Sequence, residues 1–289
     1  MFITTVARAK INLVLDVLGK RPDGYHEVKT VMQSVALHDR LEFSPGTEGI
    51  KLSVIGSDLP LDETNLVYRA AELIRSQAGI RRGVNVLIKK NIPVAAGLGG
   101  GSADAAATLV ALNKMWRTGY SLSELMRLGE QLGSDVPFCL LGGTALARGK
   151  GEQLTPLSPC PECGLVLVKP PVNVSTALVY RAFKPELIEK KPDCRAVVEN
   201  IKNGNITGIA NNLANALEPV TVQMHPQIAV IKAKLMAAGA LGALMSGSGP
   251  TVFGLAPDPE SARKVAARYA HTSELVLVTG FCNQGMYIE

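Results

Sequence analysis

The segment best suited to chemistry is a glycine-rich loop that leads into a helix-forming stretch. Four of the five residues from Gly97 to Gly101 are glycines, and Ser102 then begins an alanine- and leucine-rich run that extends to Trp116. Backbone N–H groups without a neighbouring Cβ can converge on phosphate oxygens, and the first turn of a helix adds unpaired N–H donors. An ordinary turn needs fewer glycines, so the pattern predicts a phosphate-binding loop. Ser102 would either cap the helix or coordinate a phosphate-bound Mg²⁺.

The loop matches neither of two common nucleotide-binding motifs. A P-loop requires a lysine directly before Ser102, and a dinucleotide fingerprint requires an acidic residue at the end of a following strand; this sequence has neither. Asp104 falls in the first turn of the predicted helix, where a carboxylate suits the helix dipole but would compete with phosphate. We expect Asp104 to be an ordinary helix-starting charge.

A second glycine-rich stretch, MSGSGPT, lies between two apolar segments and contains Gly247, Ser248 and Gly249. One interpretation is a hairpin turn. The other is that its glycines allow the backbone to approach a ligand closely. The pattern alone leaves both open.

Three further positions carry polar groups of interest. Lys10 and Asn12 are two residues apart in a predicted strand, so their side chains point to the same face. That face could hold a ligand or be a solvated sheet edge. Asp135 lies in an apolar stretch after a predicted helix, where a lone aspartate is more often a cap. His26, taken alone, would be a surface histidine.

Apolar periodicity predicts the elements that position these residues. In the first part of the chain it indicates strands over residues 2–18, 28–43 and 84–90 and helices over 65–78, 102–116 and 121–132. Asp62, Thr64 and Asn65 offer N-cap chemistry for the first helix. In the second part it indicates strands over 164–170, 242–246, 251–255 and 274–278 and helices over 176–183, 195–202, 226–238 and 259–270.

The arrangement favours an α+β fold with two domains, because strands and helices do not alternate strictly. Three prolines within residues 155–163 mark the best candidate for a domain edge. We therefore predict domains at 1–155 and 156–289. A length of 289 residues suits two domains, and 47% hydrophobic residues allow a large core.

The amino-acid composition also limits the classes of molecule that the protein is expected to bind. A net charge of +5 suits an anionic substrate. Scattered Lys and Arg and only 4% aromatic residues argue against nucleic-acid binding. The N-terminal residues lack a signal-peptide pattern, and no apolar stretch is long enough to span a membrane. Together with five cysteines, an odd number, this predicts a cytoplasmic protein with reduced thiols. Cys160 and Cys163 could form half a zinc site, but without a second such pair we expect an ordinary loop.

These segments together resemble the GHMP kinase superfamily, named for galactokinase, homoserine, mevalonate and phosphomevalonate kinases. The run PVAAGLGGGSADA, starting at Pro93, resembles the central motif of the superfamily. The run AKINLVLDVLGKRPDGYHEVKTVMQSVALHD, with GSDVPF and SGSGPTVFG, is similar to the branch that acts on a cytidine diphosphate-linked methylerythritol. This resemblance implies a two-domain fold with the active site in the inter-domain cleft. It also implies ATP-dependent phosphorylation of the 2-hydroxyl of 4-diphosphocytidyl-2-C-methyl-D-erythritol in non-mevalonate isoprenoid precursor biosynthesis.

The same resemblance assigns roles to residues. Lys10 and Asp135 become the catalytic pair, with Asp135 accepting the hydroxyl proton. The residues implied for the acceptor are Asn12, Tyr25, His26, Thr176 and Tyr180, with the second glycine loop nearby. Those implied for ATP are Pro93, Gly97, Leu98, Gly99, Gly100, Gly101, Ser102, Asn65 and Lys89 or Lys90. ATP and Mg²⁺ are the implied cofactors, and the chain has no clear equivalent of the glutamate that helps to hold Mg²⁺ in other members.

Two alternative functions remain. Another superfamily kinase, such as a homoserine or mevalonate kinase, is disfavoured by the Gly-Tyr-His element at Gly24. A non-catalytic nucleotide- or RNA-binding protein is conceivable because the N-terminal half resembles a ribosomal-protein fold. The presence of both Lys10 and Asp135 argues against a kinase that has lost its activity.

Overall fold

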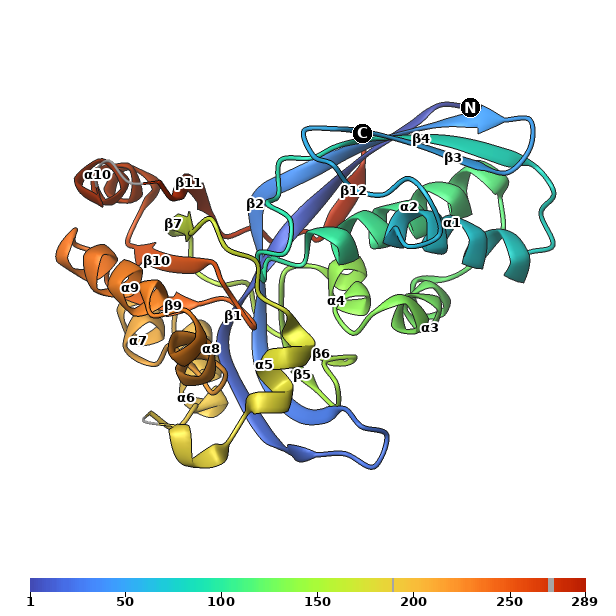
Figure 1. Cartoon of the computed structure of the whole chain (residues 1–289). Coiled ribbons are helices and arrows are strands. Elements are labelled where there is room, and N and C mark those ends of the chain that lie inside the picture. Colours follow the sequence, from blue (N-terminus) through green and yellow to red (C-terminus); the bar gives the residue numbers. More distant parts are fainter. Residues whose placement is uncertain (189, 270–272) are drawn as a thin grey trace.

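The chain folds around two β-sheets with helices packed against them (Figure 1). The structure is a computed structural model that describes residues 1–188, 190–269 and 273–289. The larger sheet contains β1 (Ile3–Lys20), β2 (His26–Gly46), β3 (Ile50–Ile55), β4 (Gly83–Lys89), β5 (Thr144–Arg148), β6 (Gln153–Pro156), β8 (Ala214–Asn215) and β12 (Met286–Ile288). The smaller sheet has the order β11 (Leu275–Gly280), β7 (Gly164–Lys169), β10 (Val252–Ala256) and β9 (Gly242–Met245).

The molecule has two parts, one formed mainly by the first half of the chain and one that contains the smaller sheet. The long antiparallel pair β1 and β2 runs through both of them (Figure 1). Most of β1 is buried, because α2 (Gly100–Trp116) covers it in one part and α6 (Cys194–Lys202) in the other. The register of the pair shifts between Arg8 and Lys10 and again between Asn12 and Val14. Such bulges re-aim side chains, and here they flank the two candidate residues of this strand.

Four helices of the first part pack with the larger sheet around one core: α1 (Leu66–Gln77), α2, α3 (Leu122–Leu132) and α4 (Val136–Leu141). Asn65 is the N-cap of α1, since its side chain accepts a hydrogen bond from Val67 N. Ser121 caps α3 through a capping box with Glu124. Small alanine side chains along α2 allow close packing against β1 and α1. These helices confirm the predictions of helices over residues 65–78, 102–116 and 121–132.

The second part places its helices around the smaller sheet. They are α5 (Thr176–Ala182), α6, α7 (Ile206–Asn211), α8 (Glu218–Met224), α9 (Gln227–Ala237) and α10 (Pro259–Tyr269), with a 3₁₀ turn at Pro185–Leu187. Residue 270, the last of the predicted helix 259–270, lies outside the described residues. Periodicity did not detect α7, α8 or the two-residue β8, which are short elements. Within the described residues, no helix is both long and apolar enough to cross a membrane.

The chain crosses between the two parts more than once. Strand β8 pairs in parallel with β1, and β12 returns to pair antiparallel with the beginning of β1. The N- and C-termini consequently lie close together (Figure 1). The α+β architecture agrees with the sequence, whereas the boundary at 155/156 stays a prediction. It falls at the end of β6, but β8 and β12 follow it in the chain and belong to the larger sheet.

One glycine should decide whether β12 can return to the larger sheet. Gly142 follows α4 with a φ of 70°, and a Cβ there would lie 1.9 Å from Gly285 N, in the segment that leads to β12. We predict that Gly142→Ala lowers the free energy of unfolding by about 2–4 kcal/mol, because backbone strain adds to overpacking. Urea unfolding measures this loss.

The matched control is Gly119→Ala. Gly119 has a similar φ of 75°, but a Cβ there meets open space. It should cost only the strain, about 1 kcal/mol. Equal losses in the two variants would show that the contact with Gly285 is not tight.

Candidate active site

A buried lysine and a partly exposed aspartate form an ion pair at the centre of the molecule. Lys10 Nζ lies 3.1 Å from Asp135 Oδ2, with side chains 6% and 30% exposed. Lys10 comes from the bulged part of β1, and Asp135 occupies the N-cap position of α4. Asp135 makes no capping hydrogen bond with its side chain, so the interpretation of this residue as a simple cap is wrong. Its carboxylate is held by Lys10 and remains accessible.

Asn12 completes this arrangement on the same face of β1. Lys10 Nζ donates to Asn12 Oδ1 at 3.0 Å, and Asn12 Nδ2 donates to Thr30 Oγ1 at 2.9 Å. Thr30 in turn donates to Val14 O, so the chain of hydrogen bonds fixes the amide orientation. Both Lys10 and Asn12 are buried. The alternative of a solvated sheet edge is therefore wrong.

The first glycine loop packs directly against Lys10. The backbone N–H of Lys10 donates to Leu98 O at 2.9 Å. A Cβ at Gly99 would lie 2.9 Å from Lys10 Cγ, and the residue has a φ of 69°. Both the space and the backbone conformation at this position therefore require glycine.

The helix that follows begins without a side-chain cap. Gly99 is the N-cap of α2 and Gly100 its first residue, so Ser102 lies inside the first turn and is not the cap. The first N–H groups of a helix have no partner within it, and here no capping side chain covers them. This cradle of N–H groups suits phosphate oxygens.

The second glycine loop approaches the same pair from the other part of the molecule. It joins β9 to β10, as a hairpin turn would, and Ser246 Oγ donates to Gly97 O at 2.9 Å. A Cβ at Gly247 would lie 3.7 Å from Lys10 Nζ. The loop is thus both a turn and a wall of the site. Asn215, which the sequence analysis missed, donates to Met245 O and Gly247 O and holds this loop. It lies in a stretch without a recognisable motif.

Aromatic rings gather beside the second loop. The rings of His26 and Tyr180 have centroids 5.2 Å apart, and Phe183 meets His26 edge-on at 6.3 Å. Burial lowers the pKa of His26, so its imidazole is neutral at pH 7. Burial, with a smaller contribution from the charge of Asp135, raises the pKa of Tyr180. Phe183 had no signal in the sequence beyond its aromatic character.

The other candidates for the acceptor have partners of their own. Tyr25 is 56% exposed, and Lys150 Nζ lies 5.1 Å from its ring centroid. Thr176 Oγ1 is 2.8 Å from Ser248 Oγ, which joins α5 to the second glycine loop. The structure therefore brings Thr176 and Ser248 together and separately pairs His26 with Tyr180.

The remaining candidates for ATP have local partners. Asn65 caps α1, and its amide donates to Pro60 O. Lys89 pairs with Glu42 at 2.6 Å, partly exposed. Lys90 is buried and pairs with Asp39 and Asp104. The expectation that Asp104 is an ordinary helix-starting charge is wrong, because it is 1% exposed and bound to Lys90.

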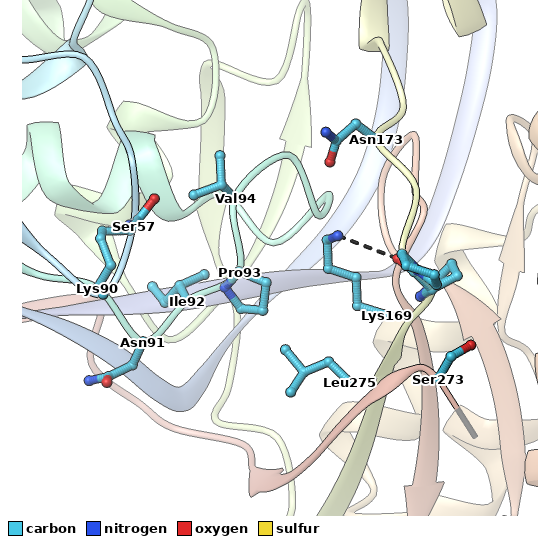
Figure 2. A pocket seen from close by; sticks show the side chains of 13 residues that line it. Ser57, Lys90, Asn91, Ile92, Pro93, Val94, Lys169, Asn173, Ser273 and Leu275 are labelled. Carbon is cyan, nitrogen blue, oxygen red and sulfur yellow. Dashed lines mark hydrogen bonds between the residues drawn. The ribbon is translucent and has the colours of Figure 1, made fainter. Parts of the chain in front are cut away.

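A cleft of about 470 Å³ lies beside the start of the first glycine loop (Figure 2). Pro93 and Val94 face it from the loop side, and Lys169 and Asn173 from the other part of the chain. A second hollow of about 580 Å³ is lined by residues 36–38 and 278–281, among others. Neither includes the Lys10–Asp135 pair, which lies between the two glycine loops.

Known proteins share this sequence and fold. Residues 65–143 match the GHMP kinases N terminal domain and residues 197–273 the GHMP kinases C terminal family. The 4-diphosphocytidyl-2-C-methyl-D-erythritol kinase of Pelotomaculum thermopropionicum is 69% identical over 96% of this chain and 98% of its own. The enzyme of that name from Bacillus subtilis is 49% identical over 88% of each chain. The chain belongs to this family of GHMP kinases.

Solved structures agree with this membership. A crystal structure of a 4-(cytidine 5'-diphospho)-2C-methyl-D-erythritol kinase matches with a TM-score of 0.81 and 39% identity, covering 96% of this chain and 99% of the other. A homoserine kinase from Cytophaga hutchinsonii matches with a TM-score of 0.77 but only 22% identity, over 100% and 97% of the chains, and shares the fold. The superfamily resemblance and the α+β GHMP kinase fold expected from the sequence are confirmed.

Removal of the Asp135 charge should abolish turnover without unfolding this GHMP kinase. We predict that Asp135→Asn lowers kcat about 10²–10⁴-fold, the usual size of a general-base contribution. The variant should still fold, with a lower melting temperature, because the buried Lys10 ammonium loses its charged partner while an amide oxygen can still accept its hydrogen bond. A coupled ADP-release assay measures kcat, with Asp58→Asn on an exposed loop as the control. More than a third of wild-type kcat in Asp135→Asn would remove the catalytic role.

The close approach at Gly99 gives a second prediction. Gly99→Val should raise KM for ATP, because the new side chain would displace Lys10 or the loop. Gly119→Val is the matched control, since its φ is similarly positive but its surroundings are open. If both variants melt alike and both keep the wild-type KM for ATP, the loop around Gly99 is only a turn.

Proposed function

We propose that this chain transfers the γ-phosphoryl group of ATP to the 2-hydroxyl of 4-diphosphocytidyl-2-C-methyl-D-erythritol. The observation that carries the proposal is the Lys10–Asp135 pair, enclosed between two glycine loops from different parts of the chain. Relatives up to 69% identical carry the name of this activity. The product would be the 2-phosphate, an intermediate of non-mevalonate isoprenoid precursor synthesis.

In the proposed mechanism each group of residues has one task. Phosphoryl transfer depends mainly on positioning and on neutralising negative charge. The loop from Gly97 to Ser102 would hold the triphosphate with its N–H groups. Asp135 would accept the proton of the attacking hydroxyl, and Lys10 beside it would stabilise the charge on the transferred group. Asn12 would orient the acceptor, because its amide is already fixed by Thr30.

The residues fit a Mg²⁺ ion that arrives with ATP. Among the described residues, no three His, Cys, Asp or Glu side chains gather into a metal site. The ion would therefore be held mainly by phosphate oxygens, with Ser102 in the first turn of α2 as the candidate protein ligand. When bound, Mg²⁺ supplies neutralisation of phosphate charge.

We propose that the cleft beside Pro93 holds the nucleoside of ATP. It is lined by the segment that leads into the glycine loop, including Pro93 and Val94, and by Ser57 (Figure 2). Asn65 lies at the start of α1, whose Leu66 contacts the position of Gly101. Both lysine candidates are paired with carboxylates, and of the two only Lys90 lines this cleft.

The aromatic group supports recognition of the acceptor through its cytosine ring. His26 and Tyr180 offer a neutral imidazole and a half-buried ring that pack against each other. Tyr25, exposed beside them in sequence, could add a second stacking face, and Thr176 a polar contact. Localisation in the cytoplasm is part of the proposal, and the five free cysteines fit a reducing compartment.

Substrate choice tests the proposed acceptor. A site built to pair with the cytosine edge leaves its own polar groups unsatisfied when uracil is bound. We predict that kcat/KM for the cytidine substrate exceeds that for the uridine analogue by about 10²-fold or more. Equal use of the two substrates would remove the cytidine pocket from the proposal, and turnover of homoserine or mevalonate alone would replace the function.

Tyr25→Ala locates the pocket in the same assay. It should raise KM for the acceptor, because base stacking on an aromatic ring is worth about 1–3 kcal/mol. KM for ATP should stay nearly unchanged. A defect confined to ATP would place Tyr25 on the opposite side of the cleft.

A further inference from the structure

A buried ion cluster lies directly beneath the first glycine loop, and none of the proposed chemical steps uses it. Lys90, at the end of β4, binds Asp39 of β2 and Asp104 of α2, the latter at 2.8 Å. All three side chains are at most 3% exposed. Burying two carboxylates and one ammonium costs free energy unless the charges pair with one another. The pairing of these three groups therefore calls for a structural explanation.

The cluster joins the two ends of the glycine loop. On the side where the loop begins, Asp39 Oδ1 accepts hydrogen bonds from the backbone N–H groups of Asn91 and Ile92, at 2.6 and 2.8 Å. On the side where it ends, Asp104 lies in the first two turns of α2. Lys90 Nζ bridges the two carboxylates, and a Cβ at Gly100 would lie 3.3 Å from it. One ammonium therefore ties the segment before the loop to the helix after it.

The charges in the cluster suit a role in positioning the glycine loop better than a role in attracting the phosphates of ATP. A formal excess of one negative charge beside a triphosphate disfavours ATP electrostatically. Burial raises the pKa of Asp104, which reduces that excess. Buried ion pairs also add little to stability compared with apolar side chains of the same shape. Their usefulness lies in specifying one geometry, which matters for a glycine-rich loop that would otherwise lose much conformational freedom when ATP binds.

The geometry points to Lys90, Asp39 and Asp104 as a positioning clamp that holds the first glycine loop in its triphosphate-binding conformation. The clamp touches neither the reacting atoms nor the acceptor side of the site. It rests on the proposed function, since it assumes that ATP phosphates occupy this loop. Lys90, Asn91 and Ile92 also line the cleft assigned to the nucleoside. Loss of the Asp104 contact alone, with the Lys90–Asp39 pair kept, should therefore weaken the binding of phosphates more than that of adenosine or of the acceptor.

Two substitutions of Asp104 separate the effect of its hydrogen bond with Lys90 from the effect of its charge. Asp104→Asn and Asp104→Ala both remove one negative charge and leave the Lys90–Asp39 pair in place. Only the asparagine keeps an oxygen that accepts a hydrogen bond from Lys90. We expect Asp104→Ala to raise the Kd for ATP about tenfold or more, because small misplacements of a binding loop are costly. Asp104→Asn should stay within about threefold of wild type, since the tie remains.

Direct binding to the full-length protein provides the measurement, with the inhibition constant of adenosine and KM of the acceptor as internal references. Both references should change less than the Kd for ATP in Asp104→Ala. The double variant Lys90→Met/Asp104→Leu gives a second test that keeps Asp39 with its two backbone donors. It should bind ATP at least as weakly as Asp104→Ala.

Three results would overturn the clamp. The first is equal ATP affinity in the alanine and asparagine variants, and the second is a loss of adenosine binding as large as the loss of ATP binding. The third is a double variant that melts lower but binds ATP within twofold of wild type, which would make the cluster purely structural. Absence of kinase activity in the wild type would instead refute the proposed function, while ATP binding would still report on the clamp.

Discussion

The site depends on the burial of the Lys10 ammonium in the middle of a β-strand. A lysine at this depth needs compensating oxygens on every accessible side. Asp135 supplies a charge from the start of α4, and Asn12 supplies an amide oxygen from the same strand. Because Asn12 is in turn held by Thr30 of β2, the position of the charge is set by the pairing of β1 with β2. The bulges around these residues adapt the strand to that task.

Close backbone approach is the second constraint. The first glycine loop reaches Lys10 at Gly99, where a Cβ would collide with the lysine side chain, and the second loop lies within ordinary contact distance of Lys10 at Gly247. The first loop belongs to the part of the chain with α1 to α4, and the second joins two strands of the smaller sheet. Ser246 connects them through Gly97 O. The loops therefore form one site only because the smaller sheet packs against the long β1–β2 pair of the larger sheet.

Much of the local structure was predictable from sequence because it depends on short-range physics. The helices that begin after Asn65 and Ser121 have caps that any reader of the sequence could identify, and their apolar faces repeat with helical spacing. The buried strands β7 and β10 are continuous apolar runs. Strand β3 was missed although its apolar residues alternate. The two-residue β8 escaped because its pattern is too short, and β12 because only its pairing with β1 makes it a strand.

The sequence by itself determined the chemical groups of this protein: a glycine-rich loop before a helix, a lysine and an asparagine on one strand face, and motifs shared with a kinase superfamily. These are properties of residue type and spacing, and they survive without knowledge of distant contacts. The family resemblance already paired Asp135 with Lys10, whereas the burial of Asp104 beside Lys90 and the hydrogen bonds by which Asn215 holds the second loop emerge from the tertiary structure. The partners in these contacts come from different elements, often far apart in the chain, and a carboxylate near the start of a helix has the same sequence signature whether it faces water or a buried ammonium.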